Sequence, residues 1–146
     1  MIRILCALAA VAVGTTMVMA QNTAPIVERK NIMKKVSDDA KMLGTMAKGE
    51  SPFDAAKANA ILTGWEESMK KYVTLFPDDS KTGEKTRAKA EIWQNKADFE
   101  AKAADFVKAA AAAKAATSAD AFKAAFGTID KACDACHEKY RGPRVT

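Results

Sequence analysis

Two cysteines and one histidine near the C-terminus form the most reactive group in the sequence. Cys133, Cys136 and His137 follow a Cys-x-x-Cys-His pattern, and His137 is the only histidine of the chain. Residues three apart on a helix lie on one face about one turn apart, so both thiols can reach one edge of a flat macrocycle. Thiols in this pattern add to the two vinyl groups of a porphyrin, and the adjacent imidazole ligates its iron. The pattern therefore predicts one covalently bound haem c. The alternative is a disulfide that happens to precede a histidine.

The first twenty residues have the features of a secretory signal peptide. They begin with a positive charge, continue in an apolar run over residues 4–13 that is too short to span a bilayer, and end in a small-residue cleavage site at Ala20. We expect residues 1–20 to be removed, leaving residues 21–146 as a single periplasmic domain with no membrane insertion after signal cleavage. Cys6 leaves with the signal. Export agrees with the haem pattern, because in a bacterial cell haem is joined to this motif on the periplasmic side.

The overall composition is lysine-rich and mildly basic. The chain has 23 Lys and Arg residues against 18 Asp and Glu residues, a net charge of +5. A positive surface of this kind suits docking to acidic partners. No dense block of basic residues alternates with aromatic residues, so we expect no nucleic-acid binding. No pair of acids stands out at helical spacing, and the single histidine is assigned to the haem, so we expect no enzymatic activity.

The distribution of residue types predicts an all-α protein. Alanine and lysine dominate, β-branched residues are sparse, and no segment alternates with a period of two. Capping and turn residues divide the mature chain into four helices. The expected ranges are about 24–48 with a stop at Gly49, 51–76 with Ser51 as the N-cap, about 88–116 after a loop over 77–86, and 117–142 before Pro143.

The apolar residues of each predicted helix recur at three- and four-residue spacing, which gives every helix one apolar face. Four such helices joined by two short links and one longer one predict an antiparallel four-helix bundle. Cys133 and Cys136 lie on the apolar stripe of the last helix. The haem is therefore expected inside one end of the bundle, at the end that carries the C-terminus.

The identity of the second axial ligand rests on the methionines. No second histidine exists, so the far side of the iron is either empty or bound by methionine, lysine or an exogenous molecule. Met33 lies near the start of the first helix, which in an antiparallel bundle is level with His137 at the end of the fourth. A helix rises about 1.5 Å per residue, so Met42 and Met46 lie well beyond the level of Met33 along the first helix. Met69 lies in the second helix. We expect these three to fill the core.

Several motifs together resemble the class II cytochromes c, the cytochrome c-prime family. They are Cys-x-x-Cys-His near the C-terminus followed by Tyr140-Arg141, Glu91-Ile92-Trp93 at the start of the third helix, and Lys48-Gly49-Glu50-Ser51-Pro52-Phe53-Asp54 between the first two. The resemblance covers essentially the whole mature chain. The family has a high-spin, five-coordinate branch and a low-spin branch in which a methionine of the first helix ligates the iron. Met33 falls at the family's distal position and resembles the low-spin branch.

Two arginines follow from the same resemblance. Arg29 matches a first-helix arginine near the haem propionates, and Arg141 matches a basic residue beside the proximal face. Propionates are anions, and a guanidinium pairs with carboxylates through fork-like hydrogen bonds. Trp65 and Trp93 are expected to pack within the bundle.

The resemblance and the motifs together predict a low-spin monohaem cytochrome that carries electrons in the periplasm, with iron ligated by His137 and Met33. The alternative is a five-coordinate cytochrome c-prime that binds nitric oxide or carbon monoxide at an open distal site. The expected partners are periplasmic redox proteins with acidic docking surfaces. Family members often pair through their first two helices, so a homodimer remains open beside a monomer. The docking surface is expected around Lys30, Lys34, Lys131, Lys139, Arg141 and Arg144.

Overall fold

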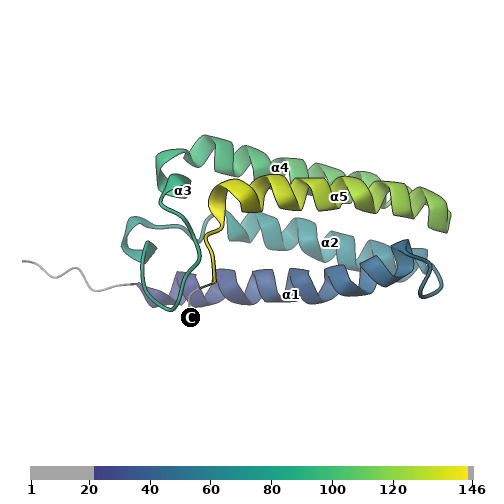
Figure 1. Ribbon diagram of the computed structural model, residues 1–146, viewed down its shortest axis with the longest axis horizontal. Helices are drawn as coiled ribbons and strands as arrows, with labels where there is room; N and C mark the ends of the chain where they lie inside the picture. Colours follow the sequence, from purple (N-terminus) through teal and green to yellow (C-terminus); the bar gives the residue numbers. More distant parts are fainter. Residues whose placement is uncertain (1–21, 145–146) are drawn as a thin grey trace, which may run out of the picture.

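The computed structural model describes residues 22–144, and its elements are helices (Figure 1). Along the chain they are α1 (Thr23–Ala47), α2 (Ala55–Tyr72), the 3-10 helix η1 (Asp78–Ser80), α3 (Glu91–Gln94), α4 (Lys96–Ala113) and α5 (Ala119–Tyr140). The four long helices α1, α2, α4 and α5 lie side by side as a bundle, with α5 against both α4 and α1. The predicted all-α four-helix bundle is therefore confirmed. The predicted signal peptide, residues 1–20, lies outside the described residues.

The turn between α1 and α2 differs in detail from the predicted one. Gly49 follows the end of α1 with φ +77°, a left-handed conformation that glycine adopts without strain. The predicted Ser51 cap is wrong. Asp54 is the N-cap of α2, and its side chain accepts a hydrogen bond from the Lys57 N–H (3.0 Å). Ser51 belongs to the turn instead, where its backbone N–H donates to the Thr45 carbonyl (3.2 Å).

The predicted third helix is divided into two. Asn95, at φ −129° and ψ 51°, separates the short α3 from α4. The helix also begins later than predicted, because the backbone before it is engaged elsewhere: Ala88 forms an antiparallel bridge with Arg141, and the Lys89 N–H donates to the Tyr140 carbonyl (3.1 Å). Long-range pairing with the C-terminal segment therefore overrides the helical tendency of residues 88–90.

The last helix begins at Ala119, two residues after the predicted start, with Ser118 as its N-cap. The Ser118 hydroxyl accepts a hydrogen bond from the Ala121 N–H (3.2 Å), as expected for an N-cap. The helix ends at Tyr140, two residues before the predicted end, since Arg141 is extended and pairs with Ala88.

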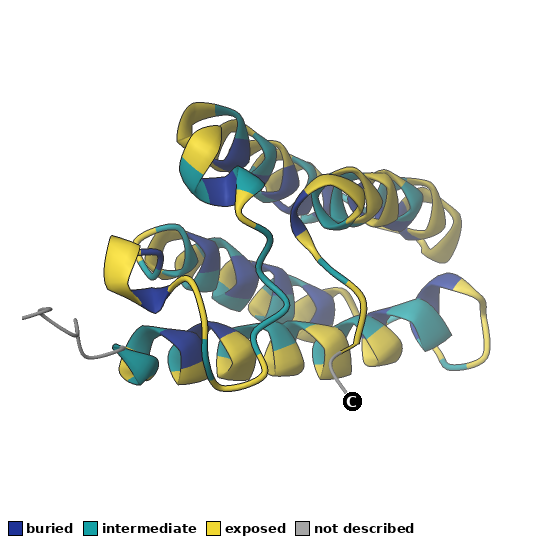
Figure 2. Cartoon of the chain, turned by 60° about the vertical axis from the view of Figure 1, so that its left-hand side comes forward, coloured by how far each residue is buried: buried dark blue, intermediate teal, exposed yellow. Residues whose placement is uncertain are grey.

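Buried side chains line the inside of the bundle along its length (Figure 2). The main core contains Leu43, Leu62, Trp65, Phe106 and Phe122. A second, aromatic cluster of Phe76, Ile92, Phe99 and Tyr140 joins α3 and α4 to the end of α5. Among residues 22–144, no helix is both long and apolar enough to cross a membrane.

One connection is central to the site. We call residues 83–88, between η1 and α3, the strap. The strap passes from the beginning of α1 to the end of α5, where it lies beside the C-terminal segment (Figures 1 and 2). The Gly142 N–H donates to the Arg87 carbonyl (2.7 Å), and the Arg87 Nε–H donates to the carbonyls of Gly142 (2.9 Å) and Pro143 (3.1 Å). The strap therefore ties the two helices that carry the predicted iron ligands.

Candidate functional site

A cavity of about 560 Å³ opens among α1, α2, α4, α5 and the strap. All six residues predicted to contact the cofactor line this cavity. Arg29 and Met33 come from α1, the motif residues Cys133, Cys136 and His137 come from α5, and Arg141 follows α5 directly. The bundle therefore brings together residues that are about a hundred positions apart in the sequence.

The two cysteines are half-buried free thiols on the cavity wall. Burial raises the pKa of the Cys133 thiol to about 11, and burial likewise raises the pKa of Cys136. Both groups are therefore neutral thiols near pH 7. Within the described part of the chain, no group of three or more His, Cys, Asp or Glu side chains could hold a metal ion, so the thiols are not part of such a cluster. Two neutral thiols one helical turn apart beside a large cavity fit covalent attachment of haem.

His137 is half-buried on the same wall, one residue after Cys136. Burial lowers its pKa, and the nearby charge of Arg141 lowers it further. The side chain is therefore held in its neutral form. Neutral imidazole is the form that binds a metal, so the environment of His137 suits an axial ligand.

Two methionines line the cavity, not one. Met33 is half-buried on α1, whereas Met69 lies on α2 and is 6% exposed. Neither Met42 nor Met46 belongs to the cavity lining. Met46 is buried in the main core as predicted, but the prediction that Met42 fills the core is wrong, since it is 39% exposed. The sequence reasoning missed Met69 as a cavity residue. Its place on the apolar stripe of α2 indicated that Met69 is buried, but not that it faces the cavity.

Arg29 is almost fully buried, at 3% exposure. Its two terminal nitrogens donate to the Leu75 carbonyl (2.9 Å), the Ser80 hydroxyl (3.0 Å), the Ser80 carbonyl (2.7 Å) and the Thr86 hydroxyl (3.1 Å). The guanidinium also lies 4.7 Å from the centre of the Phe76 ring. Burial lowers the pKa of Arg29. A buried charge normally has an opposite charge as partner, yet every described partner of Arg29 is neutral.

The cavity lining is strongly cationic. Seven basic side chains contribute to it against one carboxylate, Asp130. The basic residues are Arg29, Lys30, Lys34, Lys85, Arg87, Lys102 and Arg141. Haem carries two propionates, so a cavity with an excess of positive charge fits that group. No local pattern in the sequence marks Lys85, Arg87 or Lys102 as site residues, since tertiary contacts bring them here.

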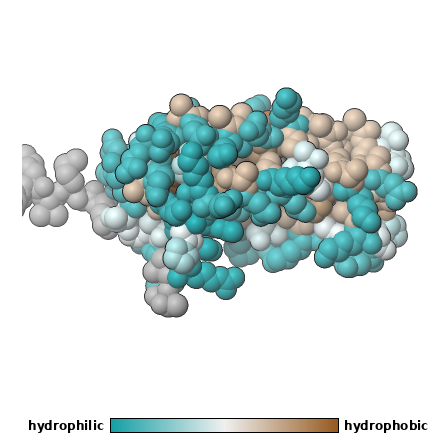
Figure 3. Space-filling view, turned by 45° about the horizontal axis from the view of Figure 1, so that its top comes forward, coloured by the Kyte–Doolittle hydropathy of each residue, from teal (hydrophilic) through white to brown (hydrophobic). Residues whose placement is uncertain are grey.

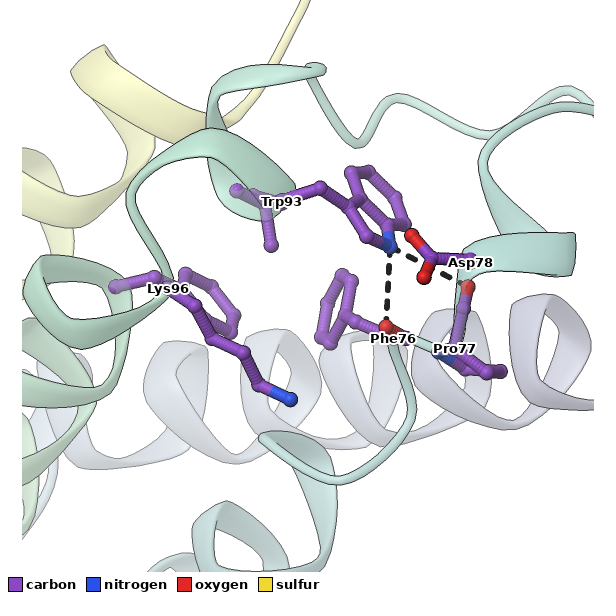
Figure 4. A pocket seen from close by; sticks show the side chains of 7 residues that line it. Phe76, Pro77, Asp78, Trp93 and Lys96 are labelled. Atoms are coloured by element: carbon purple, nitrogen blue, oxygen red, sulfur yellow. Dashed lines mark hydrogen bonds between the residues drawn. The ribbon is translucent and has the colours of Figure 1, made fainter.

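Trp93 lies behind the cavity and not on its wall. Its indole N–H donates to the carbonyls of Phe76 (3.0 Å) and Pro77 (3.3 Å), and Lys96 and Asp78 flank this second, smaller pocket of about 220 Å³ (Figure 4). Ile92 and Phe99 line both pockets. Trp65 is 1% exposed in the main core, and its indole N–H donates to Asp39 (3.2 Å). Both tryptophans therefore pack within the bundle as predicted.

Comparison with known proteins identifies close relatives over nearly the whole chain. The model of the family described as Cytochrome C' matches residues 24–141. The sequence is 36% identical over 135 residues to a cytochrome c' of Rhodopseudomonas palustris, covering 92% of each chain. It is also 35% identical over 146 residues to a cytochrome c-556 of the same species, covering 97% of each chain. The solved structure of a cytochrome c' from Rhodopseudomonas palustris superposes with a TM-score of 0.80 at 35% identity, covering 85% of this chain and 100% of the other.

Proposed function

Because the chain belongs to the cytochrome c' family of class II c-type cytochromes, which carry covalent haem c, we propose that it is a low-spin periplasmic electron carrier. We assign the axial ligands of the iron to His137 and Met33. When bound, the haem supplies a one-electron ferric–ferrous couple. The chain itself holds the group, shields it from water and sets its potential.

One observation carries this proposal. Met33 on α1 and His137 on α5 line the same cavity from two different helices, and the strap joins the ends of those helices. A histidine and a methionine on opposite sides of the iron close the site and raise the reduction potential. Cys133 and Cys136 hold the group to α5, and burial keeps the His137 ring neutral. None of these roles requires an organic substrate.

The ligand assignment is tested by three alanine substitutions. Met33→Ala should convert the absorption spectrum from low-spin to high-spin and allow carbon monoxide to bind. Met69→Ala, at the second methionine of the cavity, and Met46→Ala, in the core, are the matched controls and should leave the spectrum low-spin. A high-spin spectrum in Met69→Ala with no change in Met33→Ala would move the ligand to α2.

The second candidate function is a gas-binding cytochrome with an open sixth position. The relative called cytochrome c' favours it. Met33 is half-buried on the cavity wall, and a methionine in that position can also pack beside the iron without binding it. In that case the unmodified protein would be high-spin and would bind carbon monoxide before any substitution. The spectrum of the purified protein in both redox states, with and without carbon monoxide, separates the two candidates.

We further propose that the partners are periplasmic redox proteins with acidic docking surfaces. The basic side chains around the cavity and the net charge of +5 support this. Export itself is tested by N-terminal sequencing of the mature protein from a periplasmic fraction, which should begin at Gln21. Sedimentation of the holoprotein tests whether it forms a homodimer.

A further inference from the structure

We propose that the strap is a clamp for the haem propionates, in which Lys85 and Arg87 supply the hydrogen-bond donors and Arg29 anchors the strap. This moves the direct contact with the propionates from α1 to the strap. The inference depends on the haem c cofactor. It does not depend on which residue is the second axial ligand or on an electron-carrier role.

Arg29 has little left with which to bind a carboxylate. A guanidinium has five N–H donors, four of them on its terminal nitrogens. Those two nitrogens already donate to four acceptors in the segment from Leu75 to Thr86. Only the Nε–H remains, so the two-bond fork that suits a carboxylate is already used. The bonds instead fix the strap, because they join α1 to η1 and to Thr86.

Arg87 has the opposite arrangement. Its Nε–H is used, since it donates to the Gly142 and Pro143 carbonyls. Within residues 22–144 its two terminal nitrogens have no hydrogen-bond partner. The bonds of the Nε–H therefore hold the side chain in place while its terminal donors stay free. Arg87 also lines the cavity. It is therefore an arginine fixed at the cavity wall with four donors available for an anion.

Lys85 is presented by a strained turn. Gly83, Glu84 and Lys85 have φ values of 102°, 48° and 49°, and the Thr86 N–H closes the turn on the Gly83 carbonyl (2.9 Å). The left-handed region favours glycine, yet two successive positions here carry larger side chains. The turn places the Glu84 carbonyl on Lys30 Nζ (2.7 Å) and Lys85 on the cavity lining. Within the described chain Lys85 has no ion pair or hydrogen bond.

Of the other basic residues that line the cavity, Lys102 and Arg141 also have no described side-chain partner but lie outside the strap, whereas two lysines are engaged. Lys34 is paired with Asp38 (2.7 Å), and Lys30 donates to Glu84. Lys85 and Arg87 are two residues apart in the strap, and Glu84, the carboxylate directly before Lys85, is not part of the cavity lining. Two free cationic groups side by side match two propionates.

A charge substitution on the strap tests the clamp. Lys85→Asn keeps a residue that tolerates the left-handed conformation and removes the cation. The control is Lys81→Asn, which removes the same charge from the same connection at a residue paired with Asp78 and away from the cavity. We expect Lys85→Asn to lower the equilibrium constant for haem reduction about threefold, which is about 28 mV at 59 mV per tenfold. It should also shift the propionate carboxylate bands in the reduced-minus-oxidised infrared spectrum. Equal potential shifts in the two variants, or unchanged propionate bands, would overturn the clamp.

Substitution of Arg29 tests the anchor. Arg29→Lys keeps the charge and loses the four-bond fork. We expect cleavage after Glu84 by a Glu-specific protease to rise about tenfold, whereas cleavage after Glu50 in the α1–α2 turn, the internal control, should not change. If cleavage after Glu84 is as slow in Arg29→Lys as in the unmodified protein, the charge of residue 29 is sufficient. The proposal that the Arg29 hydrogen bonds anchor the strap would then be wrong. Neither the Lys85→Asn nor the Arg29→Lys experiment changes a proposed axial ligand. Optical spectra of all variants therefore show separately whether the Met33 assignment is correct.

Discussion

The two ends of the bundle are built from the same four helices but are filled in different ways. At the end where α4 joins α5, protein side chains fill the interior: Leu43, Leu62 and Phe122 are 0% exposed and Trp65 is 1% exposed. At the other end, the helices surround a cavity of about 560 Å³ whose wall combines apolar side chains with half-buried thiols, an imidazole and basic groups. The surface differs too, since polar side chains gather over the cavity end and more apolar ones over the opposite end (Figure 3).

The cavity end also contains the irregular backbone. The break at Asn95, the strap and the left-handed turn at Glu84 and Lys85 all lie there. Apolar side chains such as Met69, Phe99 and Phe106 also line the cavity of about 560 Å³, so a haem bound there would give them packing partners. The opposite end has a core made of protein side chains alone.

The largest effect should follow from removing the attachment residues. The variant Cys133→Ala/Cys136→Ala should yield little holoprotein, and acid–acetone extraction should leave the colour on the unmodified polypeptide only. Hydrogen exchange in the remaining chain should lose protection in the strap and at the end of α5 while amides near Leu62 stay protected. Equal protection at both ends would show that the cavity end is stable without its cofactor.

Truncation in the core should destabilise the protein without changing the site. Leu62 is fully buried, so Leu62→Ala should lower the free energy of unfolding by about 2–5 kcal/mol in urea titrations of the holoprotein. Its absorption spectrum without urea should equal that of the unmodified protein. A changed spectrum in the folded variant would mean that the two ends are coupled through packing.

A smaller effect is expected at Asp98, which holds α4 against the end of α5. Its carboxylate accepts hydrogen bonds from Lys139 Nζ (2.8 Å) and from the Tyr140 hydroxyl. These bonds, with Lys139 first, lower the pKa of Asp98 below its usual 3.8. A pKa lower in the folded state means that the carboxylate stabilises the fold above about pH 3.8 and that this stability is lost as the pH falls through the folded value.

Asp98→Asn should therefore flatten the acid side of the stability curve, measured as the urea midpoint between about pH 2 and pH 6. Asp105→Asn is the control on the same helix. Asp105 is exposed, and its side chain has no described ion pair or hydrogen bond. The same flattening in both variants would show that general charge, and not the contacts of Asp98, sets the acid limb.

The smallest expected effect concerns docking. The structure changes which lysines are available, because Lys34 and Lys139, expected in the docking surface, are paired with Asp38 and Asp98. Lys102 on α4 lines the cavity without a described ion pair, and Lys108 lies further along the same helix. Lys102→Gln should lower the second-order rate with an anionic redox reagent about twofold at low salt, and Lys108→Gln should lower it less. Identical rates in both would mean that only net charge matters.

Local features of this protein could be read from its sequence. The haem motif, the Gly49 stop and the apolar stripes all act within about one helical turn, and each is present in the structure. The level of Met33 relative to His137 followed from the antiparallel order of the helices, and both residues line the cavity. Interactions of this range depend on neighbouring residues alone, so spacing is enough to predict them.

Long-range contacts decided the rest. Arg29 bonds to Ser80, 51 positions away, and to Thr86, 57 positions away, and Arg87 bonds to Gly142, 55 positions away. Those contacts engage the terminal nitrogens of Arg29, delay the start of the third helix and bring Lys85 and Arg87 to the cavity. The wrong Ser51 cap has the same origin, since the turn hydrogen bonds to Thr45 hold Ser51 outside α2. Spacing and periodicity along the chain are therefore enough to predict the haem-binding motif and the four-helix scaffold. Which basic groups keep free donors at the cavity depends instead on which distant carbonyls the packed chain places within hydrogen-bond reach.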